Sequence, residues 1–357
     1  MPLQMPLAPA ESGSKIVIFP RSSVIISPVF DAYWRFATER QRVFFRRVRG
    51  ESGPWSSDAV LQRFRFTNAY RVTDRVSQYL VNEVQGNSPQ DPKSLFFRTI
   101  LFKLFNRIDT WKLLQSALGE LLPDSYDFAR YNLVLSQAMA RGERIYSAAY
   151  IMPSGNREGE RKHEMHLRLL ERMMREDVPL RLSDCKSMEE AFELLRSYPT
   201  IGDFLAYQYV TDLNYSTLTD FSEMEFVAPG PGARSGIQKC FPDRGSYSEA
   251  DLIRWMSDHQ DKEFSDRGLT FQTLWGRPLQ LIDCQNLFCE IDKYSRVRYP
   301  AVQGLSGRTR IKQEYRHNTE PIDCWLPPKW ELNGRIAAWR QGESRSSQIA
   351  LPAMSPA

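Results

Sequence analysis

Cysteine is scarce in this 357-residue sequence, and long apolar runs are missing. The five cysteines (Cys185, Cys240, Cys284, Cys289 and Cys324) are scattered and include no Cys-x-x-Cys pair, which favours reduced thiols over a disulfide framework or a zinc site. No apolar run approaches the roughly 20 residues of a membrane span, and no charged segment leads into a signal-peptide core. We therefore expect a cytoplasmic protein, nuclear if the host is a eukaryote, with no membrane contact.

A Gly-Lys dipeptide is absent as well. P-loop kinases hold the ATP phosphates with Gly-x-x-x-x-Gly-Lys-Ser/Thr, so the sequence excludes kinase activity by that route. Histidine offers no metal site, because His163 and His166 lie three residues apart among Arg, Lys and Glu. That spacing is not His-Glu-x-x-His, and the surroundings indicate a solvated helix face. We expect neither a metal nor another cofactor.

Two basic segments bracket an acidic middle. Residues 34–75 hold ten arginines against four acidic residues, and residues 293–316 hold seven Lys or Arg against Glu314 alone. Between them, residues 176–226 hold eleven acidic residues against three basic ones. If both basic segments reach one face, they form a phosphate-binding rim around a carboxylate-bearing centre, the layout of an enzyme that acts on nucleic acid. Solvated, arginine-rich helix faces are the other interpretation.

Hydrophobic residues make up 42% of the sequence and charged residues 25%, which is typical of a soluble globular protein. The apolar spacing predicts a mostly α, multi-helix fold with an irregular C-terminal region. We expect an irregular lead-in over residues 1–30 with a β-like run at 15–19, one helical domain over 31–330, and a disordered tail over 331–357. The expected helices begin at Asp31, Asp58, Lys93, Asp124, Glu160, Ser187, Asp203, Ser248 and Asp283.

The expected helix from Asp58 carries polar residues on one side. Asn68, Arg71 and Arg75 are spaced i, i+3 and i+7, so a continuous helix would place them on one face. We expect them to contact a base edge or phosphates. An internal salt bridge between Arg71 and Asp74 is the alternative.

A second polar stripe lies on the expected helix from Asp283. Asp283, Asn286 and Glu290 share a face in a segment whose other positions are apolar, so we expect the stripe to line a pocket. A buried structural network is the alternative, and full internal pairing of the stripe would favour a structural scaffold. Lys293 and Arg296, in the second basic segment, are expected to contact DNA.

A tight turn at residues 199–202 feeds the expected helix from Asp203. Gly202 can adopt the positive φ that such a turn requires. The helix N-terminus that follows presents unpaired N–H groups and the positive end of the helix dipole, which together hold a phosphate without reading sequence. We therefore expect a DNA contact at Gly202.

A loop with almost no side-chain bulk occupies residues 230–236. Because a bare backbone can lie against a ligand, we expect Gly230 and Gly232 to contact DNA and Arg234 to bind a phosphate or a sugar. A plain surface turn is the alternative. Just before the loop lies a cluster of three carboxylates, Asp220, Glu223 and Glu225.

The turn at 199–202 and an aspartate 18 positions after Gly202 resemble the helix-hairpin-helix region of the DNA glycosylase superfamily, with Thr200 in place of the first hairpin glycine. Three further segments are informative: Phe-Ala-Thr-Glu-Arg at 36–40, Arg-Phe-Thr-Asn-Ala-Tyr-Arg at 65–71 and Gln-Asn-Leu-Phe-Cys-Glu-Ile-Asp-Lys-Tyr at 285–294. Through them the sequence resembles, over roughly residues 31–316, the helical domain of 5-hydroxymethyl-deoxyuridine DNA kinases, also called α-glutamyl/putrescinyl-thymine pyrophosphorylases.

The hairpin resemblance implies a glycosylase-like architecture and base excision. Hydrolysis of an N-glycosidic bond develops positive charge on the sugar, which a carboxylate beside C1′ stabilises once the base is flipped out of the stack. Asp220 holds the family-like position for that carboxylate, and Glu223 competes because three helical residues would rotate it onto the same face. No lysine lies between Lys186 and Lys239, which disfavours a Schiff-base lyase mechanism.

We therefore expect a monofunctional DNA N-glycosylase that flips and excises a hydroxymethylated, hypermodified or glycosylated pyrimidine, as in defence against phages with decorated bases. The alternative is a non-hydrolytic protein, which binds a modified base in DNA or transfers a group in a thymine or cytosine hypermodification pathway. In the kinase members of the family, the helical domain accompanies a P-loop kinase. DNA with modified pyrimidines is the expected partner, with base-modifying enzymes as further partners.

Overall fold

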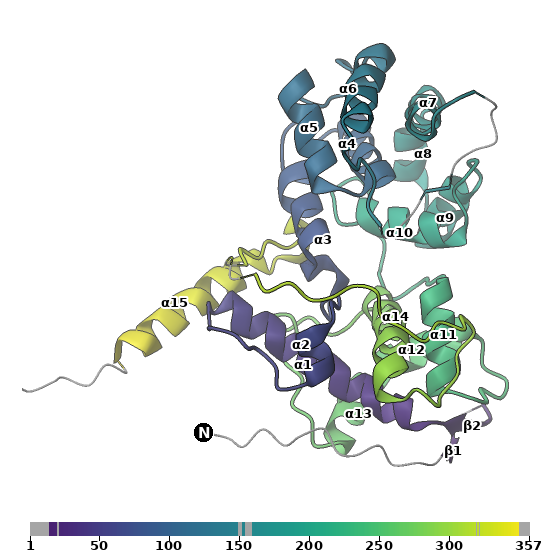
Figure 1. Ribbon diagram of the computed structural model, residues 1–357, viewed down its shortest axis with the longest axis vertical. Coiled ribbons are helices and arrows are strands. Elements are labelled where there is room, and N and C mark those ends of the chain that lie inside the picture. Colours follow the sequence, from purple (N-terminus) through teal and green to yellow (C-terminus); the bar gives the residue numbers. More distant parts are fainter. Residues whose placement is uncertain are drawn as a thin grey trace, which may run out of the picture. The chain divides into compact units, whose positions relative to one another are not determined.

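The computed structural model describes residues 14–19, 21–148, 152–153, 159–318, 320 and 322–349. Across these residues the chain is mostly helical, which confirms the mostly α part of the expected fold class, while the glycosylase-like architecture stays a prediction. The chain divides into two compact units: Met1–Thr73 with Pro229–Ala357 form unit 1, and Asp74–Ala228 form unit 2. Figure 1 shows the elements of both, with unit 2 in the blue-to-teal colours.

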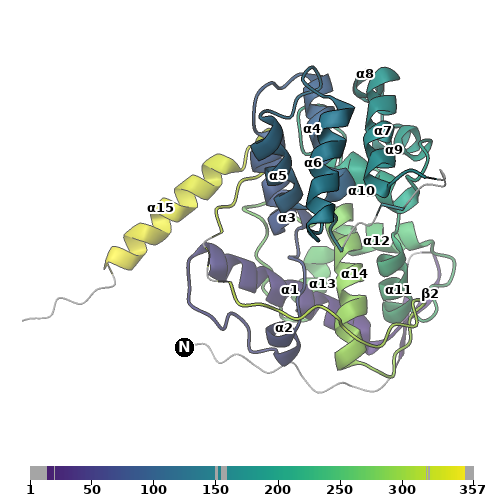
Figure 2. The ribbon, with the colours of Figure 1, turned by 45° about the horizontal axis from the view of Figure 1, so that its top comes forward.

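Helix α14 (Leu281–Arg298) is the centre of unit 1. Its apolar side chains, including Leu287, Phe288 and Ile291, are buried, and α1 (Pro28–Val48), α11 (Pro231–Cys240) and α12 (Glu249–Asp258) pack against it (Figure 2). The other helical elements of unit 1 are α2 (Ala59–Arg63), η1 (Arg71–Thr73), α13 (Gln260–Asp266), η3 (Pro328–Trp330) and α15 (Asn333–Ile349).

The N-terminal lead-in is more regular than expected. Strands β1 (Lys15–Ile18) and β2 (Ser23–Ile26) form an antiparallel hairpin, which confirms the β-like run. Helix α1 begins at Pro28, one turn before the expected Asp31, because Ser27 caps it by accepting a hydrogen bond from the Val29 N–H at 3.1 Å. Proline suits the first helical position, since its φ is already helical and no N–H is lost there.

The expected continuous helix from Asp58 to Arg75 is wrong. Asp58 does cap α2, but this helix ends at Arg63, and the chain continues in extended form. The cause is a distant partner: the Arg65 N–H donates to the Gln313 carbonyl at 3.0 Å, and the Tyr315 N–H donates to the Arg63 carbonyl at 2.9 Å. Sequence spacing cannot reveal such pairing, since it is set by residues about 250 positions away.

The bare loop expected at 230–236 is also wrong, because these residues form the first turns of α11. Its glycines serve close helix packing. A Cβ on Gly236 would lie 2.0 Å from the Phe288 carbonyl oxygen, and one on Gly232 would lie 3.0 Å from the Cys289 Sγ. The lack of side-chain bulk therefore brings α11 against α14 within unit 1.

Unit 2 is built around α4 (Pro92–Phe105), whose residues from Ser94 onward are buried on every side. The apolar stretch at 93–118 therefore forms core helices, as expected. The other helical elements of this unit are α3 (Arg75–Tyr79), the π-helical η2 (Leu80–Gln85), α5 (Ile108–Leu118), α6 (Phe128–Ala140), α7 (Lys162–Arg175), α8 (Val178–Asp184), α9 (Met188–Arg196) and α10 (Asp203–Leu213).

The expected turn and helix at 199–213 are confirmed, with one change in the backbone. Gly202 is the N-cap of α10 and has φ −84°, whereas Thr200 has φ +69°. The left-handed conformation, which disfavours most residues other than glycine, therefore falls on the position where the resembled hairpin has its first glycine. The helices α9 and α10 are consecutive, and the turn at residues 199–202 joins them.

The solvated helix face expected for the two histidines is wrong. His163 and His166 are both 1% exposed, because α7 packs on α4 and α6. The His163 Nε2 lies 2.8 Å from the Asn132 Oδ1, and the His166 Nδ1 lies 2.8 Å from the Tyr146 hydroxyl. Within the described residues, no three His, Cys, Asp or Glu side chains gather to hold a metal ion.

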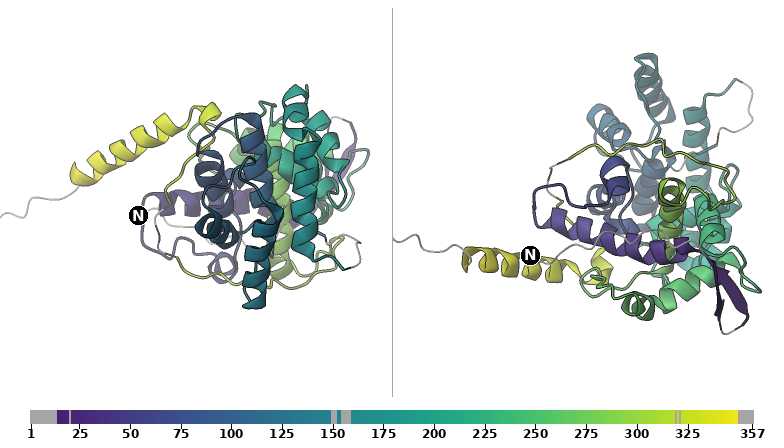
Figure 3. Two further views of the ribbon diagram at one scale, coloured as in Figure 1. Left: turned by 90° about the horizontal axis from the view of Figure 1, so that it is seen from above. Right: turned by 60° about the horizontal axis from the view of Figure 1, so that its bottom comes forward.

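The C-terminal region is irregular between α14 and η3, as expected. Part of the segment expected to be a disordered tail is helical, since α15 spans Asn333–Ile349 (Figure 3). Residues 350–357 of that tail lie outside the described residues. No helix of the described part of the chain is long and apolar enough to cross a membrane.

Candidate functional site

The segment at residues 64–73 lies along α14 and is held there by the polar stripe. Glu290 Oε2 accepts a hydrogen bond from the Thr67 N–H at 2.9 Å, and Asp283 Oδ1 accepts one from the Arg71 N–H at 2.8 Å. Between them, Asn286 Nδ2 donates to the Thr67 hydroxyl at 3.1 Å and to the carbonyl oxygen of the next residue at 3.2 Å. Three side chains on one helix face thus fix the backbone of one loop.

Asn68 joins this loop to α1. Its Oδ1 accepts a hydrogen bond from Arg40 Nη2 at 2.9 Å, and its Nδ2 donates to the Thr73 carbonyl at 2.9 Å. Arg40 Nε also donates to the Thr67 carbonyl at 2.9 Å. Both polar atoms of the Asn68 side chain therefore form hydrogen bonds that stabilise the conformation of the loop.

The stripe itself is buried, with Asp283, Asn286 and Glu290 between 5% and 7% exposed. Asp283 has a second task at the start of α14, where its Oδ2 accepts a hydrogen bond from the Gln280 N–H at 3.0 Å. Buried polar side chains are stable only when hydrogen-bonded. These contacts match the alternative of a buried structural network, and direct contact of the stripe with a base stays a prediction.

Cationic and aromatic groups flank the loop. Lys293 Nζ lies 2.8 Å from the Glu290 carboxylate and 4.6 Å from the centre of the Phe66 ring. The next residue of α14 is Tyr294, whose hydroxyl donates to Asp58 Oδ2 at 2.7 Å. Burial raises the pKa of this phenol, and the Asp58 carboxylate raises it further.

Asn68, Arg71 and Arg75 do not share a helix face. Asn68 lies in the loop, Arg71 begins η1 and is 2% exposed, and Arg75 begins α3 with an exposed side chain. The first two belong to unit 1, and Arg75 belongs to unit 2. Only Asn68 and Arg71 are therefore brought together with the polar stripe.

The acidic cluster lies in unit 2 and is not helical. Asp220 and Glu225 are exposed, whereas Glu223 is 8% exposed in a turn. The argument that three helical residues bring Asp220 and Glu223 to one face is therefore wrong. The start of the cluster is shaped by Asn214, whose Oδ1 accepts the Phe221 N–H at 2.9 Å.

The remaining expected DNA contacts are distributed over both units. Gly202 is exposed at the N-cap of α10 in unit 2, while Gly230 is the N-cap of α11 in unit 1. Arg234 Nε lies 3.3 Å from the Glu249 carboxylate, and Arg296 Nη2 pairs with Asp292. With Lys293 paired to Glu290, these three expected phosphate ligands are each bound to a carboxylate of the chain itself.

Six other exposed cations, which the sequence analysis did not single out, lie on two segments of unit 1 that pair through their backbones. The pairing of residues 63–65 with 313–315, with a bridge between Phe64 and Glu314, places the two basic segments side by side in unit 1. The charge count of the sequence showed both basic segments, but it did not show that their backbones pair. The exposed cations of this basic ribbon are Arg63, Arg65, Arg308, Arg310, Lys312 and Arg316.

Unit 1 thus combines a loop held by its central helix with exposed cations on two paired segments of the chain. Comparison with known proteins is more specific. The chain belongs to the family described as the 5-hmdU DNA kinase helical domain, whose family model matches residues 27–304.

A curated relative, the 5-hmdU DNA kinase of Bacillus phage SP10, is 27% identical over 288 residues, which cover 74% of this chain and 45% of the relative. The chain thus matches less than half of that protein's length. No solved structure matches it. The family resemblance drawn from the three sequence segments is confirmed.

The expected N-glycosylase activity is wrong. The family and the phage relative are both named for a DNA kinase and neither for a hydrolase of N-glycosidic bonds. The error has a physical origin, since a turn, a helix N-terminus and a following aspartate form a local pattern that does not specify the chemistry of a protein. The catalytic roles expected for Asp220 and Glu223 rested on that activity.

Proposed function

We propose that this chain is the DNA-handling domain of a system that phosphorylates 5-hydroxymethyl-deoxyuridine in DNA. It binds DNA that contains the hydroxymethylated pyrimidine and presents the base to a kinase domain that acts with it. The name of the phage relative supports the substrate class, and membership of the helical-domain family supports the role.

The observation that carries this proposal is the convergence of the three resemblance segments. Arg40 comes from residues 36–40, Thr67 from 65–71, and Glu290 from 285–294. Both Arg40 and Glu290 bind the backbone of the loop at Thr67. A loop whose conformation is fixed before binding loses little entropy when it meets a ligand, which favours selective recognition.

The division of labour follows from the sequence. These 357 residues contain no Gly-Lys dipeptide, so they offer no Gly-x-x-x-x-Gly-Lys-Ser/Thr loop for the phosphates of ATP. We therefore assign to this chain the binding of DNA, and not the transfer of the phosphoryl group. Phosphoryl transfer depends mainly on positioning and on stabilisation of charge, so a domain that orients the acceptor hydroxyl contributes directly to the reaction.

The hairpin between α9 and α10 supports a second contact with DNA. Gly202 leaves the N-terminus of α10 without a side-chain cap, and such N–H groups attract phosphate oxygens. Asp203 is the opposing feature, because its carboxylate stands in the first turn, where Arg196 Nη1 lies 3.5 Å away. We propose a helix-hairpin-helix type of backbone contact here, separate from base recognition.

The test is a binding assay on duplexes that differ in one base pair. The chain is titrated against labelled duplexes with hydroxymethyluracil, thymine or 5-hydroxymethylcytosine at the central position. One net hydrogen bond to the added hydroxyl is worth about 1 kcal/mol, so we expect about fivefold tighter binding of the hydroxymethyluracil duplex than of the thymine duplex. Equal affinities would contradict the proposal. Alkali treatment is expected to leave every strand intact.

A variant of the loop anchor sharpens this test. Asn286→Asp keeps the shape of the side chain but removes the donor to Thr67, so the preference for hydroxymethyluracil is expected to fall. Asn132→Asp in unit 2 is the matched control, because it removes an amide donor to Glu164 Oε1 away from the loop. A preference that survives unchanged in Asn286→Asp would show that the loop does not recognise the base.

A further inference from the structure

The basic ribbon contributes six exposed cations that have no carboxylate partner among the described residues. Residues 62–66 and 308–316 contain these six exposed cations and one acidic residue, Glu314. By contrast, Lys293, Arg296 and Arg234 each have a carboxylate within ion-pair distance. Among the described residues, none of the six ribbon cations forms an ion pair, so their charge is available to an external anion.

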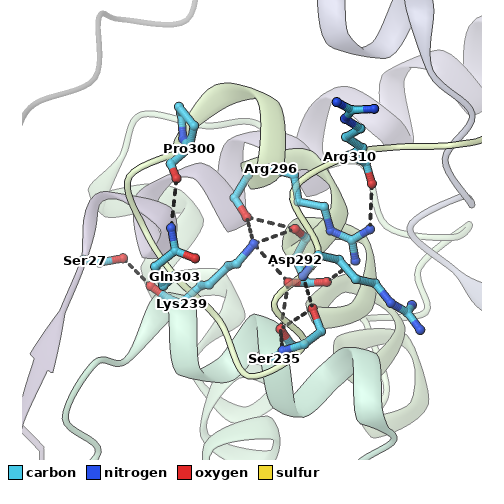
Figure 4. A network of polar contacts seen from close by, with 11 residues as sticks. Ser27, Ser235, Lys239, Asp292, Arg296, Pro300, Gln303 and Arg310 are labelled. Atoms are coloured by element: carbon cyan, nitrogen blue, oxygen red, sulfur yellow. Dashed lines mark hydrogen bonds and ion pairs between the residues drawn. The ribbon is translucent and has the colours of Figure 1, made fainter.

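The ribbon is held in place by a buried network at the end of α14 (Figure 4). Lys239 Nζ and Ser235 Oγ both bind Asp292 Oδ1, at 3.0 and 2.8 Å, and Lys239 and Asp292 are 4% and 1% exposed. Arg296 pairs with the same carboxylate and donates from Nη1 to the Arg310 carbonyl at 3.2 Å. Burial opposes ionisation of Asp292, but Arg296 and Lys239 prevail and its pKa is lowered.

Further contacts hold the rest of the segment after α14. A Cβ on Gly304 would lie 2.5 Å from Ser235 Oγ, so the chain passes α11 at close range. At the other end, His317 stacks on Trp55 with ring centres 4.9 Å apart. Between these points the backbone pairs with residues 63–65. The cations are therefore presented by a backbone fixed at both ends, which reduces the entropy lost on binding.

Spacing also suits a polyanion. Side chains at i and i+2 of an extended segment share a face and recur about every 6.6 Å, which applies to Arg63 and Arg65. One DNA strand carries a negative charge for each rise of about 3.4 Å along the helix axis, so two cations at this spacing span neighbouring phosphates of one strand. Guanidinium groups also bind phosphate oxygens in a bidentate manner.

We propose that the basic ribbon is a docking surface for the phosphate backbone of DNA. This inference rests on the proposed function for its ligand, but adds a surface beyond the family match, since residues 308–316 lie after its end at residue 304. The ribbon supplies affinity that is independent of sequence, while the loop at 65–71 supplies preference for the modified base. Phosphate contacts position a protein on DNA without reading its sequence.

The experiment compares two triple variants that each remove three positive charges. The ribbon variant is Arg65→Gln/Lys312→Gln/Arg316→Gln. The control variant is Arg130→Gln/Arg144→Gln/Lys186→Gln, made of exposed cations of unit 2 for which the structure records no carboxylate partner. Binding to hydroxymethyluracil and thymine duplexes is measured by fluorescence anisotropy from 50 to about 300 mM salt, and circular dichroism checks the fold of each variant.

The slope of log affinity against log salt is expected to become shallower by about 0.9 for each lost phosphate contact, so by roughly two to three for the ribbon variant. The control variant is expected to keep the wild-type slope, and the ribbon variant to keep the wild-type ratio between the two duplexes. A ribbon variant with the wild-type slope and affinity overturns the ribbon proposal, whatever the ratio. A ratio of one in the wild-type chain overturns the proposed base preference, while a lost slope would still support the ribbon.

Discussion

Glu290 on α14 accepts a hydrogen bond from the backbone N–H of Thr67 at 2.9 Å, across 223 positions of sequence. The same carboxylate lies 2.8 Å from Lys293 Nζ. One buried side chain thus neutralises a cation and fixes the loop that carries the family resemblance. Removal of its carboxylate would leave both a buried N–H and an ammonium without an acceptor.

Glu290→Ala is therefore expected to lower the free energy of unfolding by about 2–4 kcal/mol, and Glu290→Gln by about 1 kcal/mol, because the amide keeps an acceptor for Thr67. Urea denaturation measures the difference. Glu120→Ala is the control, since this carboxylate is exposed on unit 2. A Glu290→Ala protein as stable as Glu120→Ala would show that the loop is not anchored there.

Alanine at Gly236 tests the packing of α11 on α14. In an open helix, Gly→Ala stabilises by about 0.5–1 kcal/mol. At Gly236 the new Cβ would meet the Phe288 carbonyl oxygen at 2.0 Å, so we expect the sign to reverse and the protein to lose about 2 kcal/mol or more. Gly334→Ala in α15 is the matched control, because no atom lies within 4 Å of its Cβ position. Equal melting temperatures for the two variants would refute this packing.

A buried ion pair in unit 2 gives a test of non-additivity. Lys103 Nζ lies 3.0 Å from Asp212 Oδ2, with side chains 3% and 1% exposed. Removal of one partner leaves an uncompensated buried charge, so Lys103→Met and Asp212→Leu are each expected to destabilise by about 3–5 kcal/mol. The double variant is expected to lose clearly less than the sum. Additive losses in denaturation experiments would mean that the two charges do not depend on each other.

The buried His166 is expected to make the free energy of unfolding depend on pH. Burial lowers its pKa from 6.5 to about 4, despite its hydrogen bond to the Pro153 carbonyl. The unfolded chain therefore binds a proton on this ring between about pH 6.5 and 4, and the folded chain does not. By linkage, the free energy of unfolding rises with pH through that window and does not change above it. The protonation of His166 in the unfolded chain therefore costs the protein about 3 kcal/mol of stability at pH 4.

The variant His166→Gln isolates this contribution. Thermal unfolding of wild type and variant is followed from pH 4 to pH 8, and their difference in stability is expected to shrink as the pH falls below 6.5. A difference that does not change with pH would place the titrating group elsewhere.

The sequence predicted elements whose cause is local. Helix α12 has its capping box at Ser248, and the core helices at 93–118 and the helix at 281–298 follow from apolar spacing that burial in any helical core would satisfy. The family resemblance also came from the sequence, because its three segments lie in the loop and on the helices that the structure brings together.

What failed depended on partners far along the chain. Residues 64–70 are not helical because residues 313–315 and α14 bind their backbone. Residues 231–236 are helical, and their glycines allow α11 to pack closely on α14. His163 is buried because Asn132 and its helix cover it. The charged neighbours of His163 in the sequence gave no indication of this burial. The wrong activity had a similar cause, because it was inferred from a turn and a following aspartate whose local pattern does not specify the chemistry.

The most direct test of the central claim is hydrogen–deuterium exchange of the chain with hydroxymethyluracil DNA, with thymine DNA and without DNA. We predict that residues 65–73 gain protection with the modified duplex and less with the thymine duplex, while the basic ribbon is protected by both. Equal protection of residues 65–73 by both duplexes, or none by either, would contradict the account, because the loop held by Glu290 would then not recognise the modified base.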